Sequence, residues 1–300
     1  MPLDPQAVAW LAELRELGAP TYHDLPPAEG RKLIDEGAPA LFGEPDPIHS
    51  IEDAQAAGVP VRIYRPSDEE LPALVYFHGG GWVLGSVNSH DSLCRTLAAR
   101  CGCTLVSVDY RLAPEHPFPA AVDDAWSVTA WAAETFPAVA VGGDSAGGHL
   151  SAVTALRARD EGLALALQVL VYPVTDYSFD TASYGEWGTD TNLTEESMRW
   201  FWEHFIPADV AADDPRVSPL RASELAGVAS ALVVIAECDP LCDEGEAYAR
   251  RLEEAGVPVT LSRYDGQLHG FLRMPALFDR SRDAIDEFAG AVRAALGTSS

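Results

Sequence analysis

A serine lies at the centre of a short run of small residues. Residues 143–147 read Gly-Asp-Ser-Ala-Gly, with Ser145 in the middle. The apolar run 138–141 precedes them and a helical pattern at 148–156 follows, so the chain turns here from a buried strand into a helix. Such a corner exposes the side chain at its apex and turns the free amides of the helix N-terminus toward it. The pattern predicts Ser145 as a nucleophile, although by itself it also fits a glycine-rich turn with an incidental serine.

A serine hydroxyl needs a base to accept its proton and a third group to orient that base. Three histidines follow Ser145 in the chain: His149, His204 and His269. We expect the first two to be structural, because one lies on the helix after the serine and the other in a helical segment. His269 lies between glycines in a loop after the last predicted strand, so it is the predicted base.

The orienting carboxylate is expected just beyond the preceding strand, predicted at 231–236. Glu237 still belongs to that strand, and Asp243 is expected to cap the helix that follows. Asp239 lies between them and is followed by Pro240, which fixes the turn. We therefore predict that Asp239 orients His269 and stabilises its protonated form.

Acyl transfer also needs hydrogen-bond donors for the oxyanion that develops in the transition state. Gly79, Gly80 and Gly81 follow the apolar run 73–77, and glycines let backbone amides approach a substrate closely. The amide of Ala146 is a further candidate donor. The glycines do not continue into a phosphate-binding motif. His78, which precedes them, is expected to brace the loop by hydrogen bonds.

Strands and helices alternate around these residues. Such alternation is typical of a mostly parallel α/β sheet with helices on both faces, whose sites lie beyond the carboxyl ends of the strands. The predicted strands are 61–64, 73–77, 104–108, 138–141, 165–172, 231–236 and 259–264, and the predicted helices are 91–100, 120–134, 148–156, 243–255 and 281–296.

Two segments fall outside the alternation. Residues 1–50 show helix and loop patterns without a strand signal, and 178–215 are rich in aromatic residues at helical spacing, with Thr194 as a candidate N-cap. We expect these two segments to form a helical cap over a core made of 51–177 and 216–300. Most of the aromatic residues are expected to fill the interior of the cap, with one or two facing a substrate cavity.

Composition excludes several classes of function. The chain has 300 residues and a net charge of −26, which argues against nucleic acid and anionic membrane as partners. We find neither a signal-peptide pattern nor an apolar run that could span a membrane. The cysteine number is odd, at five, which favours free thiols, and their spacing does not suggest a metal site. The sequence thus predicts a cytoplasmic protein.

Several long motifs occur in an order that is similar to the hormone-sensitive-lipase family of α/β-hydrolases, over about residues 60–295. They are His-Gly-Gly-Gly-Trp at 78–82, Tyr-Arg-Leu-Ala-Pro-Glu-His-Pro-Phe-Pro-Ala at 110–120, Gly-Gly-Asp-Ser-Ala-Gly-Gly at 142–148, Asp-Pro-Leu at 239–241 and His-Gly-Phe at 269–271. The resemblance implies an α/β-hydrolase fold with a helical cap and a serine carboxylesterase acting on short- to medium-chain esters, without metal or cofactor.

The resemblance also implies roles for single residues. Ser145, Asp239 and His269 would form the catalytic triad, and amides among Gly79, Gly80, Gly81 and Ala146 would bind the oxyanion. Which two of the three glycines donate is not settled by the sequence, with Gly80 the leading candidate. Asp144 is expected to hold the corner in shape rather than to react.

Two other functions fit the same motifs. One is an amide or formamide hydrolase that uses the same triad. The other is a ligand receptor without catalysis, as in the plant gibberellin receptor, which resembles this family but has lost the histidine. His269 argues against the receptor. The predicted partner is a small ester, and the last strand, 259–264, offers an edge for a homodimer.

Overall fold

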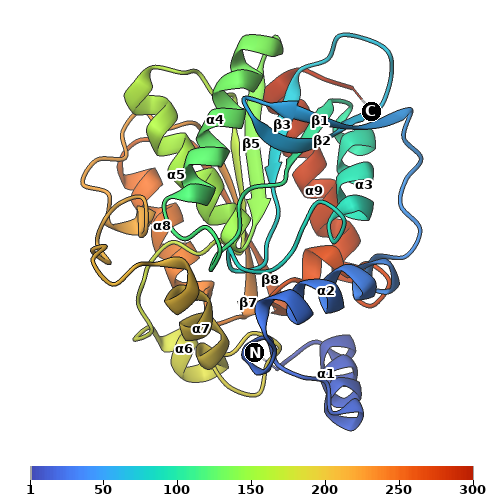
Figure 1. Cartoon of the computed structure of the whole chain (residues 1–300), viewed down its shortest axis with the longest axis vertical. Helices are drawn as coiled ribbons and strands as arrows, with labels where there is room; N and C mark the ends of the chain where they lie inside the picture. Colours follow the sequence, from blue (N-terminus) through green and yellow to red (C-terminus); the bar gives the residue numbers. More distant parts are fainter. Residues whose placement is uncertain (1, 300) are drawn as a thin grey trace.

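A twisted sheet runs through the middle of the molecule (Figure 1). The computed structural model describes residues 2–299, and in this range the sheet has eight strands in the order β1-β2-β4-β3-β5-β6-β7-β8. Neighbours from β4 to β8 are parallel, whereas β1 and β2 are antiparallel additions at one edge. The strands are β1 (Ser50–Ala56), β2 (Val59–Arg65), β3 (Ala73–Phe77), β4 (Thr104–Val108), β5 (Val139–Asp144), β6 (Gln168–Val171), β7 (Ala231–Cys238) and β8 (Val259–Leu268).

Helices cover both faces of the sheet. In the contacts between elements, α3 and α9 pack together on one face, and α4, α5 and α8 lie on the other (Figure 1). The helices are α1 (Pro5–Leu17), α2 (Pro27–Phe42), α3 (Asp91–Cys101), α4 (Ala120–Thr135), α5 (Ala146–Glu161), α6 (Ala182–Trp187), α7 (Glu195–Phe205), α8 (Cys242–Glu254) and α9 (Asp279–Leu296), with short 3₁₀ turns η1 (Tyr22–Asp24), η2 (Pro219–Arg221) and η3 (Phe271–Arg273).

The central strand β3 shows why its sequence folds this way. All five of its residues are buried, and alternate side chains enter different hydrophobic clusters. Leu74 and Tyr76 pack in the cluster that contains Phe288 of α9, whereas Val75 and Phe77 pack in the cluster that contains Leu150 of α5. A parallel strand covered on both faces is apolar along its whole length. The predicted mostly parallel sheet with helices on both faces is confirmed.

The first strand of the sheet was not predicted. The residue pattern predicts no strand before residue 61, but β1 and β2 form a hairpin that begins at Ser50. β1 lies at the sheet edge and exposes Glu52 and Asp53, so it lacks the alternating apolar pattern of a half-buried strand. Its turn includes Ala57 and Gly58, both at positive φ.

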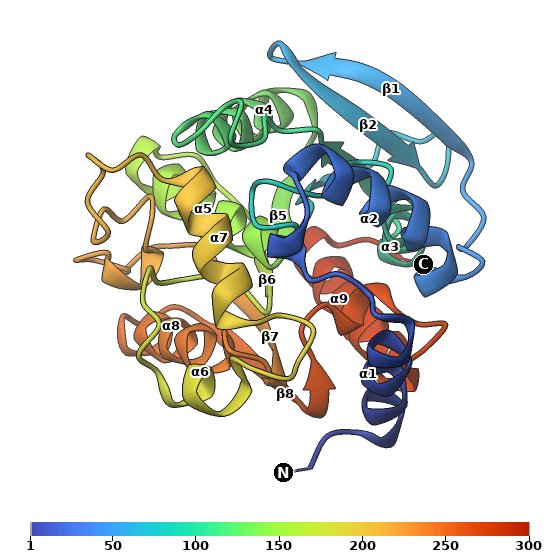
Figure 2. The ribbon, with the colours of Figure 1, turned by 60° about the horizontal axis from the view of Figure 1, so that its bottom comes forward.

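Four helices gather at one end of the sheet, as Figure 2 shows from that side. We call α1, α2, α6 and α7 the cap helices. Thr194 accepts a hydrogen bond from the Ser197 amide at 3.1 Å and so caps α7 as predicted. The Trp202 ring stacks on Tyr177 with 4.5 Å between ring centroids, in the interior expected for most of these aromatics.

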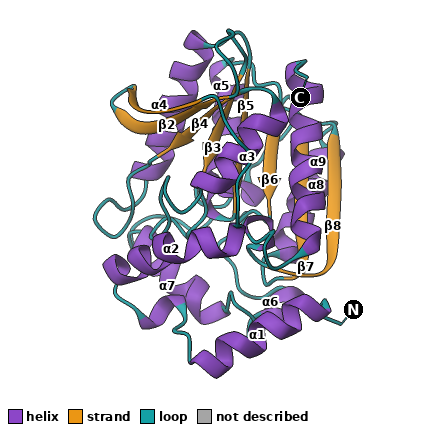
Figure 3. Ribbon diagram, turned by 90° about the vertical axis from the view of Figure 1, so that its right-hand side faces the viewer, coloured by secondary structure: helices purple, strands orange, loops and turns teal. Residues whose placement is uncertain are grey.

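Strand β8 ends the sheet on the side opposite β1. Figure 3 shows β8 at the outer edge of the sheet, beside β7. This edge position agrees with the expectation from the sequence. The homodimer through this edge stays a prediction. Among residues 2–299, no helix combines the length and the hydropathy needed to cross a membrane.

Candidate active site

Ser145 directly follows strand β5, at a corner where the backbone is strained. Ser145 has φ 57° and ψ −119°, a conformation that non-glycine residues rarely adopt. The elements on either side pass very close together. A Cβ atom on Gly143 would lie 2.4 Å from the Phe77 carbonyl oxygen, and one on Gly147 would lie 1.8 Å from it. Glycine is therefore required at both positions, and Ser145 stands at the N-terminus of α5.

The three predicted triad residues meet at this corner. Ser145 Oγ lies 2.9 Å from His269 Nε2, and His269 Nδ1 lies 2.6 Å from Asp239 Oδ2. Because an ionised carboxylate only accepts hydrogen bonds, the Nδ1–H group donates a hydrogen bond to Asp239, and Nε2 is left to accept a hydrogen bond from the Ser145 hydroxyl. The Leu241 amide donates to the other oxygen of Asp239 at 2.9 Å. All three side chains are buried.

The loop after β8 holds His269 in place. Gly270, at φ 81°, lets the chain turn directly from His269 into η3. The side-chain amide of Asn192 donates to the His269 carbonyl oxygen at 2.9 Å, and the Tyr172 ring lies 4.6 Å from the imidazole, centroid to centroid. Asn192 was not identified from the sequence, because it lies in the loop between α6 and α7, where it belongs to no motif.

Of the three acidic candidates Glu237, Asp239 and Asp243, Asp239 forms the hydrogen bond with His269. Glu237 lies on β7, as predicted, and accepts a hydrogen bond from the Gly266 amide at 2.8 Å. The prediction for Asp243 is wrong, because the N-cap position of α8 is Leu241. Asp243 lies in the first turn, where its Oδ2 accepts a hydrogen bond from the Ser183 amide of α6 at 2.9 Å.

The other candidate histidines are bound within the fold. His149 Nδ1 accepts a hydrogen bond from the Trp82 indole at 3.2 Å, and its Nε2 lies 3.1 Å from the Val217 carbonyl oxygen. His204 Nδ1 lies 2.8 Å from the carbonyl oxygen of Trp200. We call residues 79–81 the glycine loop. His78 Nδ1 lies 2.9 Å from the Gly79 carbonyl oxygen, so His78 braces this loop as expected.

The glycine loop has one amide already in use. The Gly79 amide donates to Asp144 Oδ1 at 3.0 Å. Within residues 2–299, by contrast, the amides of Gly80, Gly81 and Ala146 have no hydrogen-bond acceptor. A side chain would not fit on this loop, because a Cβ on Gly81 would lie 2.2 Å from the Phe201 ring. The donors left for an oxyanion are therefore Gly80, Gly81 and Ala146, a narrower set than the sequence offered.

Asp144 ties the serine corner to the glycine loop. Besides the Gly79 amide, its Oδ1 accepts the Tyr76 hydroxyl at 2.8 Å and lies 3.2 Å from His90 Nε2. Burial by itself raises the pKa of Asp144, but His90, Arg273 and Tyr76 outweigh burial and hold this pKa well below its ordinary value. The ionised carboxylate therefore holds both catalytic loops in one arrangement, in line with the structural role expected for it.

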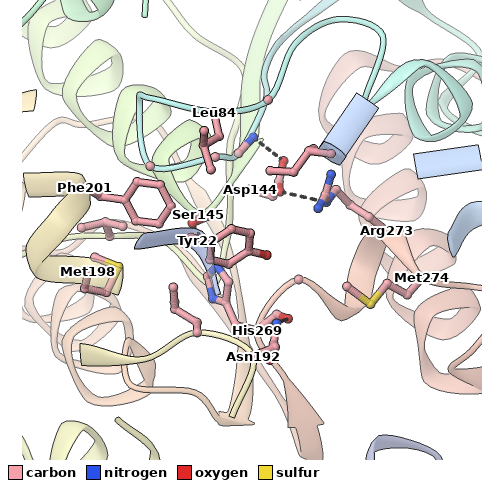
Figure 4. A pocket seen from close by; sticks show the side chains of 18 residues that line it. Tyr22, Leu84, Asp144, Ser145, Asn192, Met198, Phe201, His269, Arg273 and Met274 are labelled. Atoms are coloured by element: carbon pink, nitrogen blue, oxygen red, sulfur yellow. Dashed lines mark hydrogen bonds and ion pairs between the residues drawn. The ribbon is translucent and has the colours of Figure 1, made fainter. Parts of the chain in front are cut away.

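A pocket opens over Ser145 and His269 (Figure 4). It encloses about 600 Å³ of space, part of it open to solvent. The cap helices supply one wall through Ile34 and Met198, and η1 adds Tyr22. Arg273 also lines the pocket. Neither Tyr22 nor Arg273 was singled out from the sequence, although Arg273 lies only four residues beyond His269.

Buried neutral histidines make stability depend on pH. Burial lowers the pKa of His149 to about 4 and, together with the nearby His90, the pKa of His78 to about 3. In the unfolded chain both bind a proton below about pH 6.5, so the unfolded state holds more protons in this window. We expect the contribution of these histidines to the free energy of unfolding to be fully present above pH 6.5. As the pH falls below 6.5, the free energy of unfolding should decrease by about 1.4 kcal/mol per pH unit for each histidine.

Denaturant unfolding measured from pH 7 to pH 4 tests this expectation. The variant His149→Gln should show a shallower pH slope than the wild type, by close to one proton. Equal slopes for wild type and His149→Gln would contradict the expectation.

Comparisons with known proteins agree with this geometry. A family model described as alpha/beta hydrolase fold matches residues 74–273. The carboxylic ester hydrolase LipN of Mycobacterium tuberculosis is 46% identical over 257 residues, covering 80% of this chain and 68% of the relative. The ethyl acetate hydrolase of Pseudomonas putida is 40% identical over 310 residues, covering 95% and 96%.

A solved structure is similar over nearly the whole chain. The hyperthermophilic esterase from the archaeon Pyrobaculum calidifontis superposes with a TM-score of 0.91 at 40% identity, covering 98% of this chain and 99% of the other. The chain therefore belongs to the α/β-hydrolase family and, within it, to the hormone-sensitive-lipase group of carboxylesterases.

Proposed function

We propose that this protein hydrolyses short- to medium-chain carboxylic esters through an acyl-enzyme intermediate. The observation that carries the proposal is the hydrogen-bonded chain from Ser145 Oγ through His269 to Asp239, with distances of 2.9 and 2.6 Å, at the floor of a pocket. The names of the relatives, which include an ethyl acetate hydrolase, support small esters as substrates.

In the proposed mechanism, Ser145 attacks the ester carbonyl carbon while His269 takes the hydroxyl proton. The negative charge on the carbonyl oxygen is stabilised by the amides of Gly80, Gly81 and Ala146. Asp239 stabilises the imidazolium and remains ionised. The alcohol then leaves with the proton from His269, and a water activated by the same imidazole releases the acid and restores Ser145. The reaction as proposed uses neither a metal ion nor a cofactor.

Turnover of 4-nitrophenyl esters from acetate to decanoate tests this function. We expect kcat/KM to be highest for the shorter acyl chains and to fall toward decanoate, because the pocket is closed on one side by buried Met198 and Phe201. Met198→Ala, which enlarges the pocket at the cap, should raise the ratio of decanoate to acetate turnover by about tenfold.

The same assay distinguishes the other candidate functions. Faster turnover of N-formylkynurenine than of every ester would instead indicate a formamide hydrolase. Saturable ester binding without turnover would indicate a receptor. Either result would overturn the esterase proposal.

A further inference from the structure

The pocket above Ser145 has two chemically different sides (Figure 4). On one side lie Leu84, Met198 and Phe201, which are apolar and buried. Arg273 lies on the other side. Tyr22 lies between the two sides, because its ring is 5.7 Å from the Phe201 ring, centroid to centroid, while its hydroxyl points toward the Arg273 side. We call the Tyr22 hydroxyl and the Arg273 guanidinium the polar arm. Because the pocket is otherwise largely apolar, the guanidinium group of Arg273 is a candidate for binding a charged part of a ligand.

Arg273 has hydrogen-bond donors that the fold does not use. Its side chain is only 17% exposed. Its closest acidic partner is Asp144, whose Oδ2 lies 3.9 Å from Arg273 Nε, which is too far for a hydrogen bond. Within residues 2–299 the Arg273 guanidinium makes no hydrogen bond. A guanidinium carries five N–H donors, so the Nη side of Arg273 is free to bind a ligand.

Arg273 and Asp144 do not form a close ion pair. Its carboxylate is already held by Tyr76, Gly79 and His90 at 2.8, 3.0 and 3.2 Å. The guanidinium is therefore the most distant of these four partners of Asp144, and Arg273 lines the pocket.

Tyr22 adds a second donor to the polar arm. Its hydroxyl forms no hydrogen bond with any residue in the range 2–299. Burial raises the pKa of Tyr22 despite the opposing effect of Arg273, so the hydroxyl keeps its proton and can donate it in a hydrogen bond. Arginine and a phenol donor at one end of a cavity match the planar acceptor oxygens of a carboxylate.

We propose that the polar arm binds a carboxylate group of the substrate, so that this enzyme prefers esters with a second, ionised carboxyl group. The inference rests on the proposed esterase function and names its substrate class. The carboxylate lies away from the reacting carbonyl and takes no part in bond breaking. Its binding needs close contact, because the net charge of −26 repels anions at longer range and solvent ions screen charges beyond about 8 Å.

Matched pairs of esters test the preference. Monoethyl glutarate and ethyl valerate differ by an ionised carboxyl group in place of a methyl group on the acyl side, and acetoxyacetate and ethyl acetate differ in the same way on the alcohol side. Hydrolysis is followed by pH-stat titration with wild type, Arg273→Gln, Arg273→Lys and Tyr22→Phe. The control Arg282→Gln removes the same formal charge from an exposed position on α9.

We expect Arg273→Gln to lower kcat/KM for the carboxylate ester of at least one pair by about 10- to 100-fold relative to its neutral partner, mainly through KM. Arg273→Lys should fall between wild type and Arg273→Gln, and Tyr22→Phe should cause a smaller loss. Arg282→Gln should leave the ratio unchanged. The pair that responds shows whether the carboxylate lies on the acyl or the alcohol side.

Two results would overturn the polar arm as a carboxylate site while leaving the esterase function in place. One is an unchanged ratio in Arg273→Gln with normal turnover of neutral esters. The other is an equal loss on charged and neutral esters, which would assign Arg273 to supporting Asp144 and the glycine loop. Absence of turnover for all four esters by the wild type would instead overturn the proposed function.

Discussion

Replacing Ser145 with alanine is expected to lower kcat for 4-nitrophenyl acetate by about four to six orders of magnitude. The hydroxyl oxygen is the atom that would form the acyl-enzyme, and within residues 2–299 its only hydrogen-bonded base is His269, at 2.9 Å. Binding of the ester should change little, because the pocket walls and the free amides of the glycine loop remain. The loss is measured by steady-state kinetics and by the absence of a covalent adduct at residue 145 after treatment with an organophosphonate.

Ser151→Ala is the matched control for this prediction. Ser151 lies on the same helix, is buried and donates its hydroxyl to the Gly147 carbonyl oxygen at 2.9 Å. This variant should retain most of the ester turnover, with at most a modest loss of stability. If Ser145→Ala kept turnover comparable with that of Ser151→Ala, the nucleophile would have to be another group.

Replacing Asp239 with asparagine is expected to lower kcat by about 10⁴-fold. Asp239 Oδ2 lies 2.6 Å from His269 Nδ1 and fixes the tautomer in which Nε2 accepts the serine proton. An asparagine that donates its amide to Nδ1 would favour the wrong tautomer, and it would not stabilise the imidazolium. The fold should be retained, because the Leu241 amide can still donate to the asparagine side-chain oxygen.

Asp243→Asn makes the same chemical change four residues further along the chain. Asp243 accepts a hydrogen bond from the Ser183 amide, which an asparagine oxygen can also do. We expect kcat within about threefold of the wild type, in line with the small effects of most changes outside a site. Similar losses in the two variants would contradict the assignment of Asp239 as the orienting acid.

The sequence predicted the three candidate triad residues because each one lies within a few residues after a predicted strand. In a parallel sheet the carboxyl ends of the strands meet at the same edge. Ser145 after β5, Asp239 after β7 and His269 after β8 therefore had to approach one another, although Ser145 and His269 are 124 positions apart. Long buried strands were equally predictable from their apolar runs, whereas β1, an exposed edge strand with acidic residues, was not.

What the sequence by itself determined is the local chemistry and its order along the chain. The glycines around Ser145 are dictated by a tight corner, and the glycines after β3 by a loop that no side chain could enter. The sequence shows where these glycines lie, although the atoms that exclude a side chain, such as the Phe77 carbonyl oxygen and the Phe201 ring, come from other elements.

What only the tertiary structure decided is how residues from different elements share the site. The Gly79 amide is bound by Asp144, so three donors remain for the oxyanion. Asn192 supports the loop of His269, and Arg273 brings a charge into the pocket beside Tyr22. These contacts join segments that are distant in the chain and belong to no motif. The physical reason is that a hydrogen bond or an ion pair depends on distances of a few ångströms, which only the packing of the cap helices and loops on the sheet determines.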